Sequence, residues 1–462
     1  MKHFAIGLVL VATVCWEASA SEKILLLDDR VIDRVENAVL RVGEVQKHPS
    51  NPLFGEDKPW EVRVDNMYPT VVFDEREGIY RCWYNTFMED VDSWFYAEMG
   101  LCYATSRDGL HWEKPELGVV EFNGNKANNL VARRLHGAGV FMDNAERDPA
   151  RRFKMFCCTG DHGPPVKGTD PRAVRNPRKM GVAFSPDGWR WSEMKLCPEI
   201  GKWGDTHNNA MWAPEIGKYV GITRKWSGGR VVMRTESPDF IHWTEAVEVM
   251  HGEELAQTYS MPVFRYAGVY LGLVSIYNPQ AGRVHCELAW SPDTVKWTRI
   301  QPGTPLIPTS NRPGDYDWGC VYAGAPVFEQ NEIRLYYGAS DLGHEDKRKG
   351  FLALATLRPD GFAGYEPEAP DQQATVVTRP ITCTGKHLTL TADAQGGSIT
   401  VSIVDEDGVM RLESEPIAGN VTDKLVSWKN GGSLKTHIGN KIRLRATIRN
   451  AKVYAFGFSS AP

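Results

Sequence analysis

The chain has 462 residues, of which 42% are hydrophobic and 24% are charged, as in ordinary globular proteins. Its formal net charge of −5 comes from interspersed charges of both signs. Because the sequence has neither a basic stripe nor an acidic block, it argues against a nucleic-acid partner and against a solvated acidic tail, and it favours a small or neutral partner.

The first twenty residues have the pattern of a secretory signal peptide. Lys2 and His3 precede an apolar run over residues 4–16, and residues 18–20 are the small residues that precede a cleavage site. A membrane anchor is the alternative, but the run is shorter than the ~20 apolar residues that a spanning helix needs, and no later stretch is long enough. We therefore expect a secreted or periplasmic protein that has no membrane association after cleavage.

Nine cysteines are present, and Cys15 lies in the predicted signal peptide. Export permits disulfides, but no two cysteines have C-x-x-C spacing, and most lie in apolar runs such as IYRCWY and LCYA. This context favours small buried hydrophobic side chains over a disulfide framework or a zinc site. The remaining cysteines are Cys82, Cys102, Cys157, Cys158, Cys197, Cys286, Cys320 and Cys383.

Two alternating repeats begin after residue 60. Segments with an apolar pair, a turn and a second aromatic-rich strand begin at Pro69, Gly137, Asn208, Ser260 and Gly324. The motif S-x-D-x-x-x-W occurs at Ser106–Trp112, Ser185–Trp191, Ser237–Trp243 and Ser291–Trp297, with a degenerate copy at Arg358–Phe362. Ser and Asp side chains can bond backbone amides in a tight turn, and the Trp can then fold back over the hairpin.

One hairpin and one S-x-D turn supply the four strands of a β-propeller blade, and five such units close a ring without free sheet edges. Helical periodicity is nearly absent from the sequence. Stacked β-sandwiches are the alternative, although they need no fixed repeat. We predict an all-β fold, with a five-bladed β-propeller and its N-terminal leading segment over residues 21–365, a linker over 366–378 and a small β-sandwich over 379–462.

Candidate functional residues precede or begin the first strand of each blade, because these strands line the channel of a propeller. Carboxylates there are Asp65, Asp205, Glu254 and Asp317, and other polar residues are Asn66, His136, His207, Gln257, Tyr259 and Tyr322. Trp203 and Trp318 are candidates for stacking on sugar faces. Each aspartate has an alternative role as a turn cap, and each tryptophan has one as a packing residue. The segment DTHNN, which begins at Asp205, is the most polar of the five segments that precede the first strands of the blades.

Cleaving a glycosidic bond needs one protonated and one ionised carboxyl group. Asp65 and Asp205 are the leading acids, and Asp317 or Glu254 would complete the site. His136 and His207 have no metal-ligand spacing, so we expect them to bond a sugar hydroxyl or a backbone carbonyl. We expect no metal or other cofactor at the site, and the sequence leaves a structural calcium ion open.

The five blades, the S-x-D turns, the inner-strand carboxylates and the appended sandwich resemble the five-bladed β-propeller glycoside hydrolases of families 43, 32, 68 and 117. The likeness covers about residues 60–365. It implies a secreted enzyme that cleaves a poly- or oligosaccharide with three acids, of which the first, a base or nucleophile on blade one, corresponds to Asp65. Blade two has His136 where the family has an aspartate, and no glutamate follows an inner strand in a comparable motif.

Two other functions stay open from the sequence. The first is a non-catalytic propeller that binds carbohydrate. The second is a sialidase-like exo-glycosidase, since the S-x-D turns are similar to the Asp boxes of sialidases. Sialidases bind a substrate carboxylate with three arginines, for which Arg63, Arg224 and Arg265 are the candidates.

Overall fold

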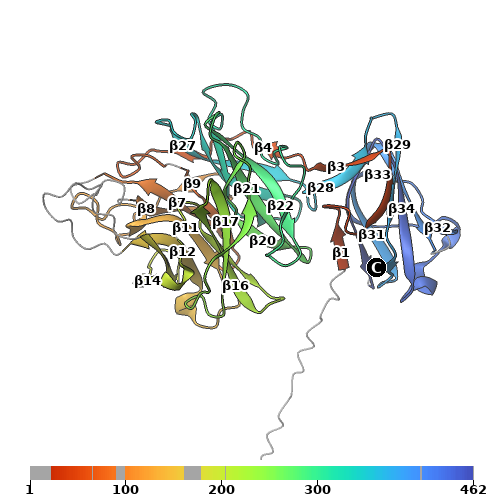
Figure 1. The fold of residues 1–462 in the computed structure, drawn as a ribbon, viewed down its shortest axis with the longest axis horizontal. Coiled ribbons are helices and arrows are strands. Elements are labelled where there is room, and N and C mark those ends of the chain that lie inside the picture. The colour runs from red at the N-terminus through yellow and green to blue at the C-terminus, as the bar shows by residue number, and fades with distance from the viewer. Residues whose placement is uncertain are drawn as a thin grey trace, which may run out of the picture. The chain divides into compact units, whose positions relative to one another are not determined.

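The computed structural model describes residues 22–64, 66–89, 99–160, 178–202, 204–405 and 408–460. These residues form β-strands and short 3-10 helices (Figure 1). They divide into two compact units, one of residues 40–364 and one that combines residues up to 39 with those from 365 onward. None of the helices in the described ranges is long and apolar enough to cross a membrane. The predicted signal peptide lies outside the described residues.

The larger unit is a β-propeller, as predicted, and its strands follow the repeats. They form four sheets, because a parallel bridge between Val284 and Cys320 joins the antiparallel strands of the fourth and fifth repeats into one 11-stranded sheet. Blade one contains β6 (Thr70–Asp74), β7 (Ile79–Phe87), β8 (Met99–Ser106), β9 (Trp112–Glu113) and β10 (Leu130–Arg133); blade two contains β11 (Leu135–Met142), β12 (Phe153–Gly160), β13 (Arg178–Ser185) and β14 (Lys195–Leu196); blade three contains β15 (Asn209–Ala213), β16 (Lys218–Trp226), β17 (Arg230–Ser237) and β18 (Val247–His251). Blade four contains β19 (Gln257–Ser260), β20 (Val263–Tyr266), β21 (Val269–Asn278), β22 (Arg283–Ser291) and β23 (Thr298–Arg299), and blade five contains β24 (Cys320–Ala323), β25 (Val327–Phe328), β26 (Ile333–Ser340) and β27 (Gly350–Leu357). The 3-10 helices η1 (Pro149–Arg151) and η2 (Pro198–Ile200) lie on connections in and after blade two.

The N-terminal part of the chain completes blade five. The short strands β4 (Gln46–Lys47) and β5 (Phe54–Gly55) both pair with β27. Blade five also packs directly on blade one, because a Cβ added to Gly338 would lie 2.5 Å from the carbonyl oxygen of Asn66. The hydroxyl of Tyr336 donates to the carbonyl of Gly109 over 3.0 Å at the same junction. The ring is therefore closed by contacts between its last and first blades.

The S-x-D turns have the predicted hydrogen bonds. In the second copy, Asp187 Oδ1 accepts from the backbone amides of Trp189 and Arg190 at 3.1 and 2.9 Å, and Ser185 Oγ accepts from the amide of Gly188 at 2.8 Å. The copies at Asp108, Asp239 and Asp293 likewise accept two backbone amides each. The degenerate copy differs, since Asp360 itself has a positive φ of 63° and accepts from the Tyr266 hydroxyl.

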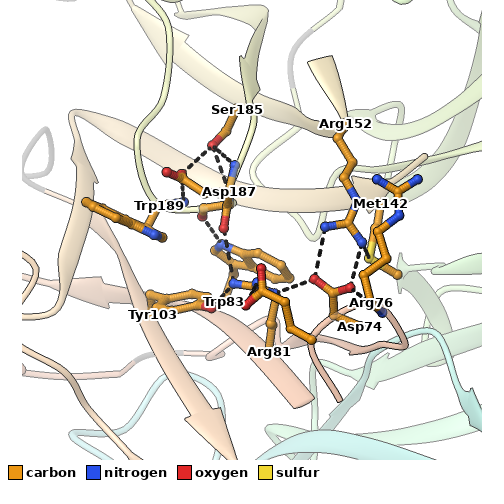
Figure 2. Close-up of polar contacts among 12 residues, drawn as sticks. Asp74, Arg76, Arg81, Trp83, Tyr103, Met142, Arg152, Ser185, Asp187 and Trp189 are labelled. Carbon is orange, nitrogen blue, oxygen red and sulfur yellow. Dashed lines mark hydrogen bonds and ion pairs between the residues drawn. The ribbon is translucent and has the colours of Figure 1, made fainter. Parts of the chain in front are cut away.

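These turns also join neighbouring blades. Figure 2 shows the second turn against blade one, where Trp83 Nε1 donates to the carbonyl of Gly188 at 2.6 Å. Beside it, the buried carboxylate of Asp74 in blade one binds Arg81 of the same blade at 3.0 Å and Arg152 of blade two at 2.6 Å (Figure 2). The repeat thus supplies both the turn and the contact between blades.

Cysteine side chains are part of the hydrophobic cores of the propeller. All eight described cysteines are buried and none forms a disulfide within the described chain, as their apolar context predicts. Burial raises the pKa of the Cys286 thiol, so this side chain remains a neutral, small apolar group.

The smaller unit is the predicted β-sandwich. Its strands are β1 (Glu22–Leu25), β2 (Ile32–Glu36), β29 (Gln373–Thr378), β30 (Ile381–Thr382), β31 (His387–Val404), β32 (Met410–Glu413), β33 (Ile417–Leu425), β34 (Lys441–Arg449) and β35 (Lys452–Ser459), with β3 (Ala38–Val42) and β28 (Ala363–Pro367) at the division between the units, and 3-10 helices η3 (Lys429–Gly431) and η4 (Leu434–His437). The first half of β31 pairs with β35 and the second half with β34, and Gly396, at a φ of 74°, lies between the halves.

Two segments differ from the domain limits expected from the sequence. Strands β1 and β2 do not lead into the propeller, because they pair with β35 and β29 of the sandwich unit. The segment 366–378, expected as a linker, contains β29, in which Ala374, Val376 and Val377 are buried. Burial of these apolar side chains stabilises a strand here, although the neighbouring prolines predicted a linker.

Candidate functional site

One region of the propeller collects polar and aromatic side chains from all five blades. They come from the starts of inner strands and from the ends and loops of the following strands. Antiparallel pairing explains this, because the second strand of a hairpin ends beside the start of the first, as Gln257 opposite Tyr277 illustrates. We call this region the central cluster, and its described members are Asn66, Tyr68, His136, Asp205, His207, Arg224, Arg230, Gln257, Tyr259, Tyr277, Tyr322, His344, Glu345 and Arg348.

Four buried tyrosines form the middle of the cluster. The ring of Tyr259 lies 6.1 Å from that of Tyr277 and 5.4 Å from that of Tyr322, which in turn lies 5.6 Å from Tyr68. The Asn66 amide joins two of them by donating to the hydroxyls of Tyr68 at 2.6 Å and Tyr259 at 3.3 Å. The result is a buried network of aromatic rings and fixed hydroxyl groups.

Asp205 is the carboxylate held most closely within the described part of the cluster. Its Oδ1 lies 2.5 Å from Nε2 of His136, and its Oδ2 lies 3.5 Å from Nη2 of Arg224. The side chain is 46% exposed, so a ligand can reach it. The neighbouring guanidinium stabilises the carboxylate anion. Asp205 can therefore serve as a base, a nucleophile or an acceptor for a sugar hydroxyl.

Three arginines surround the tyrosines. The guanidinium of Arg224 lies 4.4 Å from the ring centre of Tyr259, and that of Arg230 lies 4.5 Å from that of Tyr277. Arg348 Nη2 donates to the Asn66 side-chain oxygen at 2.7 Å. Burial opposes the charge of Arg224, but the nearby Tyr259 and Asp205 outweigh burial and raise its pKa. A guanidinium group carries a positive charge at neutral pH.

Two histidines of the cluster are neutral at neutral pH. Burial lowers the pKa of His207 to about 3, and burial together with the charge of Arg348 lowers the pKa of His344 to about 3. His207 stacks on Tyr68 with ring centres 5.5 Å apart, and His344 Nδ1 lies 2.9 Å from the Tyr322 hydroxyl. Both rings can exchange hydrogen bonds with a ligand without adding charge.

Glu345 lies at the solvent side of the cluster. Its Oε1 accepts from the Tyr277 hydroxyl at 3.3 Å and lies 3.7 Å from His344 Nε2, while its side chain is 74% exposed. Among the described residues, no group of three or more His, Cys, Asp and Glu side chains is arranged to hold a metal ion.

Most of the sequence-predicted site residues are brought together. Those in the central cluster are Asn66, His136, Asp205, His207, Gln257, Tyr259 and Tyr322. Asp65 and Trp203 lie outside the described residues.

The other predicted residues have different surroundings. Asp317 is buried, and its Oδ2 pairs with Lys47 Nζ of β4 at 2.6 Å. This ion pair attaches β4 to blade five, so Asp317 is not a member of the central cluster. Glu254 is exposed and contacts the cluster through its backbone carbonyl, which accepts from Gln257 at 3.3 Å. The ring of Trp318 lies 4.9 Å from the guanidinium of Arg283.

Sequence reasoning did not single out Tyr68, Arg230, Tyr277, His344 and Arg348. The signal that could have found them is strand direction, because the loops KWSGGR and DLGHEDKRKG follow second strands and so return to the end where the first strands begin. Of the three arginines considered for a sialidase-like site, only Arg224 is in the cluster. Arg63 lies over the Phe87 ring and Arg265 pairs with Glu215.

Comparisons with known proteins give distant similarities. The chain matches no known protein family profile. Over 141 residues it is 26% identical to two proteins of Mycobacterium tuberculosis, from strains CDC 1551 / Oshkosh and ATCC 25618 / H37Rv, both named as uncharacterized, and the match spans 27% of this chain and 44% of theirs.

Several solved structures are similar at low identity. An N-acetylgalactosamine deacetylase from F. plautii is 16% identical, covering 68% of this chain and 95% of the deacetylase, with a TM-score of 0.48. A glycosyl hydrolase from Bacteroides ovatus is 16% identical over 68% and 94% of the two chains, with a TM-score of 0.43. A structure described for the GH130 family of mannoside phosphorylases is 14% identical over 72% and 97%, with a TM-score of 0.44. At these values no residue role or substrate transfers to this chain.

Proposed function

We propose that this protein is a secreted glycoside hydrolase that cleaves a poly- or oligosaccharide at the central cluster. The observation that carries the proposal is the position of Asp205, a partly exposed carboxylate fixed by His136 and Arg224. Around it, tyrosine, histidine and amide groups from different blades converge, as polar and aromatic groups do at a ligand site. Glycoside hydrolysis needs two carboxyl groups beside the bound sugar, and Asp205 is our candidate for one of them.

Two carboxyl groups have to share the chemistry. Asp205 takes the ionised role, since Arg224 stabilises its anion, and it acts as nucleophile or activates water. Asp65 is our choice for the second carboxyl group, because it directly precedes Asn66, a member of the cluster. Glu345 is the alternative, since its carboxylate touches Tyr277.

A non-catalytic carbohydrate-binding propeller is the second candidate. It is favoured by the contacts of Asp205 with His136 and Arg224, because a carboxylate already held by two partners also serves well as a fixed acceptor for sugar hydroxyls. The sialidase-like alternative loses two of the three arginines predicted for it, because Arg63 lies over Phe87 and Arg265 pairs with Glu215.

The test is a turnover assay on the chain without residues 1–20. A panel of polysaccharides and oligosaccharides is incubated with the protein, and released reducing ends are measured. We expect Asp205→Asn to lower the rate at least about 100-fold, the usual contribution of an acid or base group. Glu193→Gln, an exposed site on blade two, is the matched control and keeps full activity.

Equal turnover by wild type and Asp205→Asn would remove Asp205 from the mechanism. Binding of a glycan by the wild type without release of reducing ends would favour the non-catalytic propeller instead.

A further inference from the structure

Arg230 is a cation in the cluster without a described anionic partner. Its Nη1 donates to Gln257 at 2.9 Å, and its guanidinium lies over the rings of Tyr259 and Tyr277 at 4.9 and 4.5 Å. It forms no ion pair with a carboxylate of the described chain, and its Nε is buried without a hydrogen-bond partner there. A buried guanidinium N–H without an acceptor is unfavourable, so this donor is suited to a ligand.

Arg224, whose guanidinium lies over the same Tyr259 ring, has a second donor that is unpartnered in the described chain. Its Nη1 is buried and has no hydrogen-bond partner among the described residues, although its Nη2 lies near Asp205. The three arginines also lie near His344. Burial lowers the pKa of His344 most, the positive charges of Arg348, Arg230 and Arg224 lower it further, and the negative charge of Asp205 raises it. The described cluster thus contains three arginines and two carboxylates, Asp205 and Glu345.

We propose that Arg224 and Arg230, with Arg348 beside them, bind an anionic group of the sugar, either a carboxylate or a sulfate ester. The inference rests on the proposed function, because it names the substrate class of the same site: an acidic glycan. Guanidinium groups pair with such oxyanions through two parallel N–H donors. The buried tyrosine rings hold the guanidinium groups in place, and the partly exposed carboxylate of Asp205 lies beside Arg224.

Trp226 extends this surface toward solvent. It is 68% exposed, and its ring centre lies 5.6 Å from the guanidinium of Arg230. A large exposed aromatic residue beside an unpaired cation is typical of a binding surface, because exposure of so much apolar area is unfavourable without a ligand. A neighbouring sugar of the chain can stack there.

The test compares each acidic glycan with its neutral form by isothermal titration calorimetry. The probes are trigalacturonate and its methyl ester, and a 4-sulfated carrageenan oligosaccharide and its desulfated form, together with the best-bound glycan of the turnover panel and its neutralised form. We expect at least one acidic form to bind about tenfold or more tightly than its neutral partner. The uronate and sulfate arms decide which anion is bound.

Substitutions of Arg230 test whether the arginines cause the tighter binding of acidic glycans. Arg230→Gln is expected to remove the tenfold preference, Arg230→Lys to retain part of it, and Arg107→Gln, an exposed site on the first S-x-D turn, to leave it unchanged. If Arg230→Gln does not fold, the salt dependence of the wild type decides, because only binding of an anion weakens as NaCl rises from 50 to 500 mM.

The outcomes separate the two proposals. Equal affinity for acidic and neutral forms, or a neutral best-bound glycan, would overturn the anionic subsite and leave the hydrolase intact. If no glycan is bound or cleaved, the proposed function fails and the subsite fails with it.

Discussion

His136 and Asp205 face each other across two neighbouring blades, with Nε2 of the imidazole 2.5 Å from Oδ1 of the carboxylate. The backbones behind them touch, because a Cβ added to Gly137 would lie 1.6 Å from the carbonyl oxygen of Thr206. The amide of Asn208 donates to the carbonyl of Gly137 at 2.9 Å in the same place. The approach of blades two and three therefore fixes the geometry of this pair.

We first predict that His136 positions Asp205. His136→Ala should lower kcat about tenfold or more and change KM less, because the carboxylate loses the partner that orients it. Kinetics of His136→Ala, Asp205→Asn and the double variant check this. The double variant should be no slower than Asp205→Asn alone, and additive losses would contradict a shared role.

Gly137 should be the glycine of this junction least tolerant of substitution. Gly137→Ala is expected to cost about 3 kcal/mol or more, because its φ is 57° and the added methyl meets the backbone of Thr206. Gly217→Ala is the matched control, since Gly217 has a similar φ of 61° with nothing near its Cβ position, and should cost only about 1 kcal/mol. Urea unfolding measures both, and equal losses would contradict the close approach.

Asp74 should stabilise the junction of blades one and two. Burial raises its pKa, but Arg152 and Arg81 outweigh burial and hold the pKa below its ordinary value of 3.8. Its contribution is therefore present above about pH 3.8 and lost as pH falls below that value. Asp74→Asn should cost about 3 kcal/mol at pH 7, because it leaves two guanidinium groups near a neutral amide. Chemical unfolding at pH 7 checks this, and an unchanged free energy of unfolding would contradict it.

His207 should make the free energy of unfolding depend on pH between about 3 and 6.5, mostly above the range in which Asp74 acts. Burial lowers its pKa to about 3 from 6.5, so the unfolded chain binds a proton below pH 6.5 that the folded chain does not. The free energy of unfolding should fall as pH drops from 6.5 toward 3. His207→Gln should reduce this slope, while His251→Gln at an exposed site should not. Tm measured between pH 4.5 and 7.5 tests it, and identical slopes for wild type and His207→Gln would overturn it.

Trp226 should contribute to substrate binding. Trp226→Ala is expected to raise KM about fivefold with little change in kcat, because loss of a stacking face weakens ground state and transition state alike. Trp212→Ala serves as control, since this partly exposed residue lies next to the turn at the other end of the blade three hairpin. Equal effects of the two variants on KM would contradict a specific role for Trp226.

Local pattern alone was enough to predict the blades. Apolar pairs recur with a turn between them, and the Ser and Asp of each S-x-D turn satisfy amides only two or three residues away, as in Ser185 to Arg190. Interactions of this range are encoded within each repeat. For the same reason, the starts of the inner strands led to Asn66, His136, Asp205, Tyr259 and Tyr322 in the cluster.

Only the tertiary structure decided which distant residues meet. Arg230 and Arg348 join the cluster because the ring brings blades three and five to the same centre, and no local spacing records that approach. Asp317 lies in the same kind of polar segment as the residues of the cluster. Its buried carboxylate instead pairs with Lys47, some 270 residues away in sequence, because a buried charge needs an oppositely charged partner. The sequence by itself therefore determined the repeating blade and its turns, while closure of the ring determined the charge and chemistry of the site.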